Sequence, residues 1–442
     1  MKQLFTNIKT TLFLTALLVV LFGAKVNAQV SAYTFGSSAG TYTEISGGTV
    51  LGTTTNDDNV FNNNPIGFAF FYNGVPYCNF SVNANGFIAM GGSVSSSYGA
   101  ISTGGTNNVI AAFNRDLQGN AGTGELSYLT TGSAPNRTLV VQFKSYRNYN
   151  DATGQIYNFQ IRLSEGTNQI RTVYGSGNYT GTFTHQVGLR GASNADFNNR
   201  TTTADWSATT AGGTNGATCT SSPTVFPASG LTYTWTPAAS PTTTYYSKST
   251  ATNFSTLSDW GVNGDGSGAA PGAIDNTANF IVANGANVTL NATLSVRSLY
   301  ILCGSTLNVA ANTLNVAITG LNQATFVNLG TLNVTGGTIN VDGNFLNAGT
   351  FSQSAGNINV DGNNAGIAAN SVPAGTAIVE LASGTYNLTG GTLTVVDPHA
   401  NTTASESFRY NSTANYNCPV GHTVRFGNGT STDPGGNLPS GS

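Results

Sequence analysis

Charged residues are scarce in this sequence. Only 7% of the 442 residues are Asp, Glu, Lys or Arg, and the formal net charge is −3. Disordered chains combine high net charge with few aromatic residues, whereas 10% of this chain is aromatic. We therefore expect a folded protein. No stretch is basic enough to bind nucleic acid, so that class of partner is excluded.

Cysteine and histidine are also few, and their spacing argues against a zinc site. The three histidines lie far apart, and no two cysteines have the CxxC spacing typical of zinc ligands. Two cysteines fall in each half, so an exported chain could form one disulfide per half, with buried free thiols as the equal alternative. The sequence does not fix the pairing of Cys78, Cys219, Cys303 and Cys418.

Long hydrophobic runs are absent except near the N-terminus. There, two lysines precede an apolar run over residues 12–22, and Val-Asn-Ala follows at 26–28. This pattern predicts a secretory signal peptide over residues 1–28, cleaved before Gln29. The run is too short for a transmembrane helix, and no later segment is apolar enough to span a bilayer. We expect a secreted or cell-surface protein.

Helical periodicity is missing from residues 33–237, where short strands and turns follow one another. Apolar and polar residues alternate over 157–163, and Asn-Gly turns at 73–74 and 85–86 separate apolar runs. Many short strands joined in this way predict an antiparallel β-sandwich of jelly-roll type over residues 30–237. The small, Pro-containing segment 238–244 is the expected linker.

One segment of the second half is written twice. Residues 326–343 (FVNLGTLNVTGGTINVDG) and 345–362 (FLNAGTFSQSAGNINVDG) share ten of eighteen positions at an offset of 19. A fixed period of this size is typical of solenoids. Alternation places Leu332, Val334, Ile339 and Val341 on the inward face, with Gly, Asn and Asp at the corners. Three strands and three corners per repeat predict a right-handed parallel β-helix over 245–442, with regular coils from about residue 280.

An aromatic segment precedes these coils. Tyr245, Tyr246 and Trp260 lie within residues 245–275, which we interpret as the cap of the first coil, since terminal repeats are atypical. A platform on which sugar rings stack is the functional alternative.

Threonine and asparagine recur at the outward positions of the predicted coils. A stacked array of hydroxyl and amide groups could contact carbohydrate, a partner surface or ice. Alternatively, these residues only solvate the solenoid while their Asn side chains form ladders. The pairs are Thr306/Asn308, Thr313/Asn315, Thr331/Asn333, Thr338/Asn340 and Thr392/Thr394.

Acidic residues suggest one metal site and one catalytic pair. The run 56–59 supplies oxygen ligands for a structural calcium ion through Asp57 and Asp58, and Asp116 with Asp151 would do so if they met in space. A solvated acidic turn is the favoured alternative, and no other cofactor is expected. Asp342 and Asp361 occupy equivalent corners, but Asp-Gly is itself a turn dipeptide.

A polysaccharide lyase or hydrolase is the alternative function that a β-helix scaffold raises. A lyase needs a basic side chain to remove a proton, and the chain contains no lysine after Lys248 and only three arginines there. A hydrolase needs two carboxylates at a set separation, whereas the acidic residues of this half are few and lie mostly at corners. We therefore predict no catalytic site; an inert spacer is the third possibility.

Several motifs resemble a known group of proteins. Segments of the first half resemble modules of large secreted and cell-surface proteins of the Bacteroidota type, and loosely nidogen-type domains through AFNRD at 112–116. The second half resembles adhesin-like β-helices. The motifs are GGTVL at 47–51, PIGF at 65–68, NGFI at 85–88, APNR at 134–137, NFQIRL at 158–163 and GLTYTW at 230–235.

The resemblance implies a cell-surface adhesin or structural protein that contacts carbohydrate or matrix and has no catalytic activity. Such proteins are usually cargo of type IX secretion and carry a C-terminal sorting domain. No such domain is found in this sequence, so we expect the chain to be a fragment of something longer.

Overall fold

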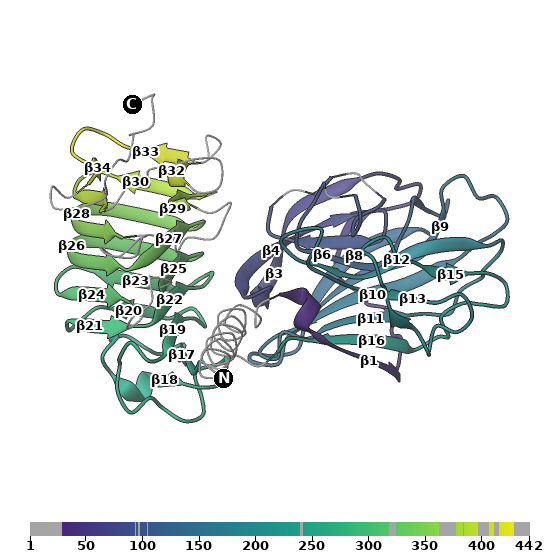
Figure 1. Ribbon diagram of the computed structural model, residues 1–442, viewed down its shortest axis with the longest axis horizontal. Helices are drawn as coiled ribbons and strands as arrows, with labels where there is room; N and C mark the ends of the chain where they lie inside the picture. The colour runs from purple at the N-terminus through teal and green to yellow at the C-terminus, as the bar shows by residue number, and fades with distance from the viewer. Residues whose placement is uncertain are drawn as a thin grey trace, which may run out of the picture. The chain divides into compact units, whose positions relative to one another are not determined.

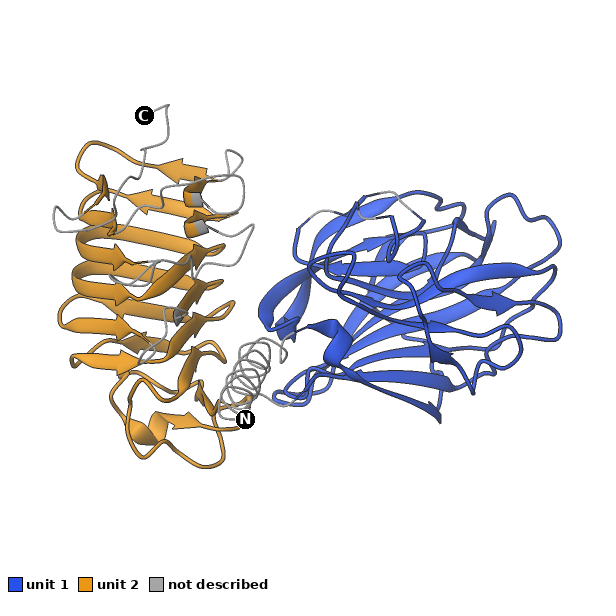
Figure 2. Ribbon diagram, in the orientation of Figure 1, with its two compact units in different colours: residues 1–240 blue, residues 241–442 orange. Residues whose placement is uncertain are grey.

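A computed structural model describes residues 29–92, 94–95, 98–103, 105–238, 242–317, 324–361, 377–382, 384–396, 406–410 and 415–427. The chain divides into two compact units, residues 1–240 and 241–442, which Figure 2 colours separately. The predicted signal peptide lies outside the described residues. Within them the only helical segments are the short 3-10 turns η2 (Val30–Ala32) and η3 (Leu257–Asp259), and none could cross a membrane.

The first unit contains two antiparallel sheets (Figure 1). Sheet I consists of β1 (Thr34–Ala39), β2 (Thr49–Gly52), β7 (Leu117–Gly119), β8 (Glu125–Thr131), β9 (Thr138–Asn148), β10 (Tyr157–Ser164), β11 (Ile170–Tyr174) and β16 (Leu231–Thr236). Sheet II consists of β3 (Val60–Tyr72), β4 (Val75–Asn83), β5 (Phe87–Met90), β6 (Val109–Asn114), β12 (Phe183–Arg190), β13 (Phe197–Thr201), β14 (Thr210–Ala211) and β15 (Cys219–Ser221).

The core of the first unit lies between these two sheets. The ring of Phe113 in sheet II lies 5.6 Å from that of Phe159 and 6.1 Å from that of Tyr174, both in sheet I. The predicted alternation along β10 is confirmed, because its apolar side chains are buried in the same hydrophobic core as Phe113. The first unit therefore buries the apolar faces of both sheets in one core.

The strand order of the first unit differs from the predicted jelly roll. Strands β3 to β6 are neighbours in sequence order in one sheet, and β8 to β11 are neighbours in the other. Consecutive strands therefore form meanders, whereas a jelly roll is built from two Greek keys. Tight turns favour this arrangement: at the β3–β4 hairpin Asn73 and Gly74 both have positive φ, 54° and 76°.

The second unit also contains two sheets, and their pairings are parallel except between the first two strands of sheet III. Sheet III consists of β17 (Thr244–Ser247), β18 (Trp260–Gly261), β19 (Asn279–Val282), β22 (Ser298–Ile301), β25 (Ala324–Asn328), β27 (Gly343–Asn347), β29 (Ala377–Leu381) and β32 (Glu406–Tyr410). Sheet IV consists of β20 (Asn287–Thr289), β21 (Leu294–Val296), β23 (Thr306–Val309), β24 (Thr313–Val316), β26 (Thr331–Val341), β28 (Thr350–Val360), β30 (Thr385–Leu388), β31 (Thr392–Val395), β33 (Asn415–Asn417) and β34 (Thr423–Phe426).

The duplicated segment pairs with itself in register. Phe326 is the partner of Phe345, and Ile339 is the partner of Ile358, so equivalent residues stack at the offset of 19. The residues predicted to face inward are fully buried, which confirms that face. The Gly-Gly corner does not end a strand, because β26 continues through it with a shift of register and a φ of 65° at Gly337.

The cysteines differ from the expected pattern. Cys78 and Cys303 are disulfide-bonded, whereas Cys219 is a buried free thiol and Cys418 an exposed one. Because one cysteine of each half is free, the expectation of one disulfide within each half is wrong. Burial raises the pKa of Cys219 to about 12, so its thiol stays protonated and unreactive at neutral pH.

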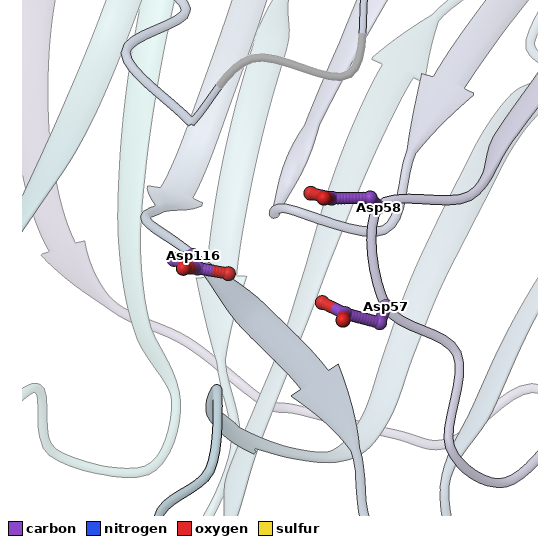
Figure 3. Close-up of side chains that lie close together, drawn as sticks. All are labelled: Asp57, Asp58 and Asp116. Carbon is purple, nitrogen blue, oxygen red and sulfur yellow. The ribbon is translucent and has the colours of Figure 1, made fainter.

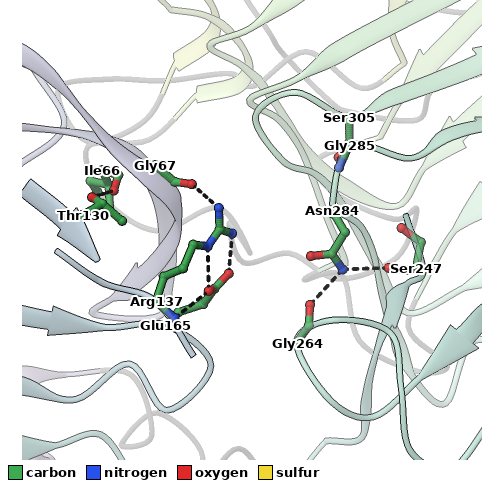
Figure 4. Close-up of polar contacts among 10 residues, drawn as sticks. All are labelled: Ile66, Gly67, Thr130, Arg137, Glu165, Ser247, Gly264, Asn284, Gly285 and Ser305. Atoms are coloured by element: carbon green, nitrogen blue, oxygen red, sulfur yellow. Dashed lines mark hydrogen bonds and ion pairs between the residues drawn. The ribbon is translucent and has the colours of Figure 1, made fainter. Parts of the chain in front are cut away.

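Polar contacts fix loops in each unit (Figure 4). In the first unit, Arg137 donates from Nε and one terminal nitrogen to both carboxylate oxygens of Glu165, at 2.8 and 2.5 Å, and from the other terminal nitrogen to the carbonyl of Gly67 at 2.6 Å. In the second unit, Nδ2 of Asn284 donates to the carbonyls of Ser247 and Gly264 at 2.8 and 2.9 Å. Each side chain thus joins backbone segments that are distant in the sequence.

Candidate functional site

Three carboxylates lie close together in the first unit (Figure 3). Asp57 and Asp58 lie on the loop that follows β2, and Asp116 immediately precedes β7. One oxygen atom from each lies within 4.8 Å of the others. The loop is held beside β7 because the amide of Gly119 donates to the carbonyl of Asn56 at 2.8 Å.

Asn85 connects the two segments that carry the carboxylates. Its side chain is fully buried; Nδ2 donates to Oδ1 of Asp58 at 2.8 Å, while its own Oδ1 accepts the amide hydrogen of Leu117 at 2.8 Å. From the sequence, Asn85 is expected only to be a turn residue. Its Asn-Gly dipeptide predicts the turn, but nothing in the sequence indicates which distant carboxylate it contacts.

Burial and mutual repulsion raise the pKa of two of these carboxyl groups. Burial, followed by the charges of Asp58 and Asp116, raises the pKa of Asp57. Burial and the charge of Asp58 also raise the pKa of Asp116, although Arg115 opposes this. Oδ1 of Asp57 is buried and has no hydrogen-bond partner among the described residues. Calcium binds carboxylate oxygens of this kind and completes its coordination with carbonyls and water.

The predicted calcium ligands are therefore brought together in part. Asp57, Asp58 and Asp116 meet, but Asp151 is not in the group. Instead Oδ1 of Asp151 accepts a hydrogen bond from the amide of Thr153 at 2.7 Å within its own turn. Asp116 therefore joins Asp57 and Asp58 in the cluster, whereas the carboxylate of Asp151 is held by its own turn.

The predicted threonine and asparagine positions form columns on sheet IV. Thr306, Thr331 and Thr350 are register partners on β23, β26 and β28. Asn308 and Asn333 form the adjacent column. All five side chains are partly exposed, and the columns point away from the core because their apolar neighbours are buried.

The asparagine columns are internally hydrogen-bonded. Nδ2 of Asn333 donates to Oδ1 of Asn308 at 3.0 Å, and Nδ2 of Asn308 donates to Oδ1 of Asn287 at 2.7 Å. A second ladder runs through Asn340, which donates to Asn315 and accepts from Asn359, both at 2.9 Å. These bonds support the interpretation in which asparagines stabilise the stack.

The aromatic segment is a core element. Trp260 is 1% exposed, and its Nε1 donates to the carbonyl of Phe254 at 2.9 Å. Its ring lies 5.1 Å from that of Phe280, and Tyr245 stacks on the same ring at 5.6 Å. The hypothesis that Trp260 stacks on sugar rings is therefore wrong, because its ring is covered. Tyr245 and Tyr246 are partly exposed.

Asp342 and Asp361 follow β26 and β28, one layer apart, and are partly buried. Burial raises the pKa of Asp342. Their amides donate to the carbonyls of Val316 and Val341 at 2.9 and 2.8 Å, which is the role of residues that end a strand.

Comparison with known proteins bears on the first unit. Residues 32–237 match a family model described as NIDO related. No curated protein and no solved structure is significantly similar to the chain. The match supports the nidogen-type resemblance that the motif at 112–116 indicated, and it includes the segments that carry the acidic cluster.

Proposed function

We propose that this chain is a secreted or cell-surface protein without catalytic activity that contacts carbohydrate or matrix through its second unit. The NIDO-related match of residues 32–237 and the presence of disulfide-bonded cysteines support an extracellular, structural role. Residues 1–28 are its cleaved signal peptide in this proposal, and type IX secretion is the proposed export route.

The second unit is proposed to be a right-handed parallel β-helix. From β22 onward the chain passes repeatedly from sheet III to sheet IV and back, and its strands pair in parallel with their equivalents in the next repeat. This arrangement supports a coil in which every turn of the chain adds one strand to sheet III and one or two strands to sheet IV. Its outer surface then presents the same side chains at regular intervals.

The observation that carries the contact function is the uncharged polar surface that sheet IV presents on β20, β23, β26, β28 and β30, whereas its exposed Arg425 lies on β34. Threonine and asparagine side chains occupy successive equivalent positions there and remain partly exposed. Regular hydroxyl groups suit a repeating ligand, since each repeat of the ligand can meet an equivalent group.

A binding screen tests this function. The purified mature chain would be applied to a panel of polysaccharides and matrix proteins, and reducing-sugar and unsaturated products would be measured in the same wells. We expect retention on at least one polymer without product. Product formation would instead establish the enzyme alternative, and the absence of binding to every polymer would leave the spacer.

A structural cation is a second proposed property, and the buried, unpartnered Oδ1 of Asp57 favours it. Calcium should raise the melting temperature of the first unit, since it relieves the repulsion among three carboxylates. We expect Asp58→Asn to abolish this rise and Asp151→Asn to retain it, in calorimetry of the full chain with calcium or with a chelator. An equal response in both variants would place the effect elsewhere.

A further inference from the structure

We propose that the row formed by Thr306, Thr331, Thr350 and Thr385 binds a neutral, linear polysaccharide. This inference rests on the proposed contact function and names its ligand class. The four residues are successive register partners on β23, β26, β28 and β30. Parallel strands lie about 4.8 Å apart, so the row repeats one hydroxyl group at that interval.

The hydroxyl groups of this row have unused hydrogen-bonding capacity. Among the described residues, none of the four Oγ1 atoms takes part in a hydrogen bond, whereas the neighbouring amides of Asn308 and Asn333 are bonded to each other. The asparagine column therefore fixes the surface, and the threonine column retains donors and acceptors for a ligand. Thr306, Thr331 and Thr350 are partly exposed and Thr385 is exposed, so these groups are accessible.

Charge distinguishes between classes of polymer. The positions in register with this row and with the adjacent asparagine column, on β20, β23, β26, β28, β30 and β33, contain only Thr, Asn and Ser. An anionic polymer would find no counter-charge along these two columns, since the exposed Arg425 lies on β34 in another column, and complementary charge is what selects charged partners. A neutral polysaccharide exchanges hydrogen bonds with hydroxyl groups and needs no counter-ion.

The same surface is a poor match for a protein partner. Cores of protein interfaces are enriched in aromatic, Met and Arg side chains, and the outward positions of these strands have none. Phe351 on β28 and Tyr386 on β30 point inward and are fully buried, and the one exposed aromatic residue of these strands, Tyr416 on β33, is in register with Tyr386 and not with the row. A polymer bound along the row would instead gain affinity from several equivalent weak contacts.

The test compares two rows of threonines in the full-length mature chain. Thr331→Val with Thr350→Val removes two hydroxyl groups and keeps β-branched side chains. The matched control is Thr313→Val with Thr338→Val, on the neighbouring strand segments β24 and β26. Retention would be measured on cellulose, a neutral β-1,3-glucan, alginate and heparin, with circular dichroism to verify folding.

We expect the chain to bind a neutral polymer, and binding to persist in high salt. Loss of two hydrogen bonds should weaken it about tenfold, the control should bind like wild type, and Thr331→Ser with Thr350→Ser should restore most affinity. Equal weakening in both rows, or binding to alginate or heparin alone, would overturn this inference and leave the contact function intact. If the chain bound no polysaccharide in the full panel, both this inference and the proposed contact with carbohydrate would be wrong.

Discussion

The two units arrange the hydrogen bonds of their polar side chains in opposite ways. In the first unit, four strand pairs shift register at bulges, and polar side chains form contacts that occur once, such as that between Nε2 of His185 and Oγ of Ser221 at 2.8 Å. In the second unit, one asparagine contact recurs from strand to strand. A change in the first unit should therefore have effects particular to its site, whereas a change in the second should resemble the same change one repeat away.

The largest expected effect is that of Ile339→Asp in the second unit. Ile339 is fully buried between register partners Leu314 and Ile358. An unpaired carboxylate there should lower the free energy of unfolding by about 4 kcal/mol or more. Calorimetry of the full chain should show a much lower temperature for the unfolding transition of the second unit. Thr338→Asp, on the outward face, should change it by about 0.5 kcal/mol; similar losses in the two variants would contradict the assigned faces.

Acid should destabilise the first unit more than the second. His185 is fully buried, and burial together with Arg115 lowers its pKa well below 6.5. The unfolded chain binds a proton near pH 6.5 and the folded one does not, so stability falls as the pH drops below that value, by about 1.4 kcal/mol per pH unit. In the second unit, His422 is only partly buried, and burial lowers its pKa less.

The variant His185→Gln isolates this effect. Gln can still contact Ser221 but cannot take up a proton, so the melting temperature of the first unit should depend less on pH between 5 and 7. The raised pKa values of Asp57 and Asp116 act in the opposite direction, because the folded state holds those protons more tightly as the pH falls. An unchanged pH dependence in the variant would exclude His185 as the cause.

Replacing one hydrogen-bonded asparagine should lower the free energy of unfolding more in the first unit than in the second. Nδ2 of Asn148 donates to Oε1 of Gln155 and to Oη of Tyr157, both at 2.7 Å, and these partners are buried. Asn148→Ala should therefore cost about 2 kcal/mol, since water cannot replace the lost bonds.

The matched change in the ladder is Asn340→Ala. Asn340 is partly exposed, so water replaces part of what is lost, and we expect about 1 kcal/mol. Asn357→Ala, at an exposed position outside the ladder, should have little effect. Urea unfolding of each variant measures these differences, and a larger loss at Asn340 than at Asn148 would reverse the comparison between the units.

Thiol labelling should distinguish the free cysteine of the first unit from that of the second, and it requires no substitution. An alkylating reagent should modify exposed Cys418 in the native chain and buried Cys219 only after denaturation. Intact mass should then show one adduct in the native protein, two after denaturation, and four after reduction. Four adducts in denatured protein without a reductant would contradict the disulfide-bonded state of Cys78 and Cys303.

The sequence predicts the second unit better than the first for a physical reason. In the second unit the contacts of a residue follow from the repeat, so alternation alone identified Leu332 and Ile339 as buried. In the first unit the decisive contacts are distant: the amide of Ser31 donates to Oδ1 of Asp196 at 3.0 Å across 165 residues. No local pattern indicates that contact, nor the strand order that replaced the jelly roll.

The candidate cation site shows the same limit. Its two adjacent members, Asp57 and Asp58, were found from local composition. The third, Asp116, depends on the pairing of β7 with β9, which the sequence does not reveal. Trp260 illustrates the converse case, because composition identified an aromatic segment, but only packing shows that its ring is covered.

The asparagine ladder has a consequence for how this surface could change in evolution. Ser295, Asn315, Asn340 and Asn359 follow one another in the second ladder and are separated by 20, 25 and 19 residues along the chain. Their side chains nevertheless remain aligned and hydrogen-bonded. Additional residues between strands thus leave the ladder unbroken. Tandem duplication of one repeat would lengthen both columns by one step without requiring any compensating substitution. The length of this surface could therefore change in evolution by one repeat at a time.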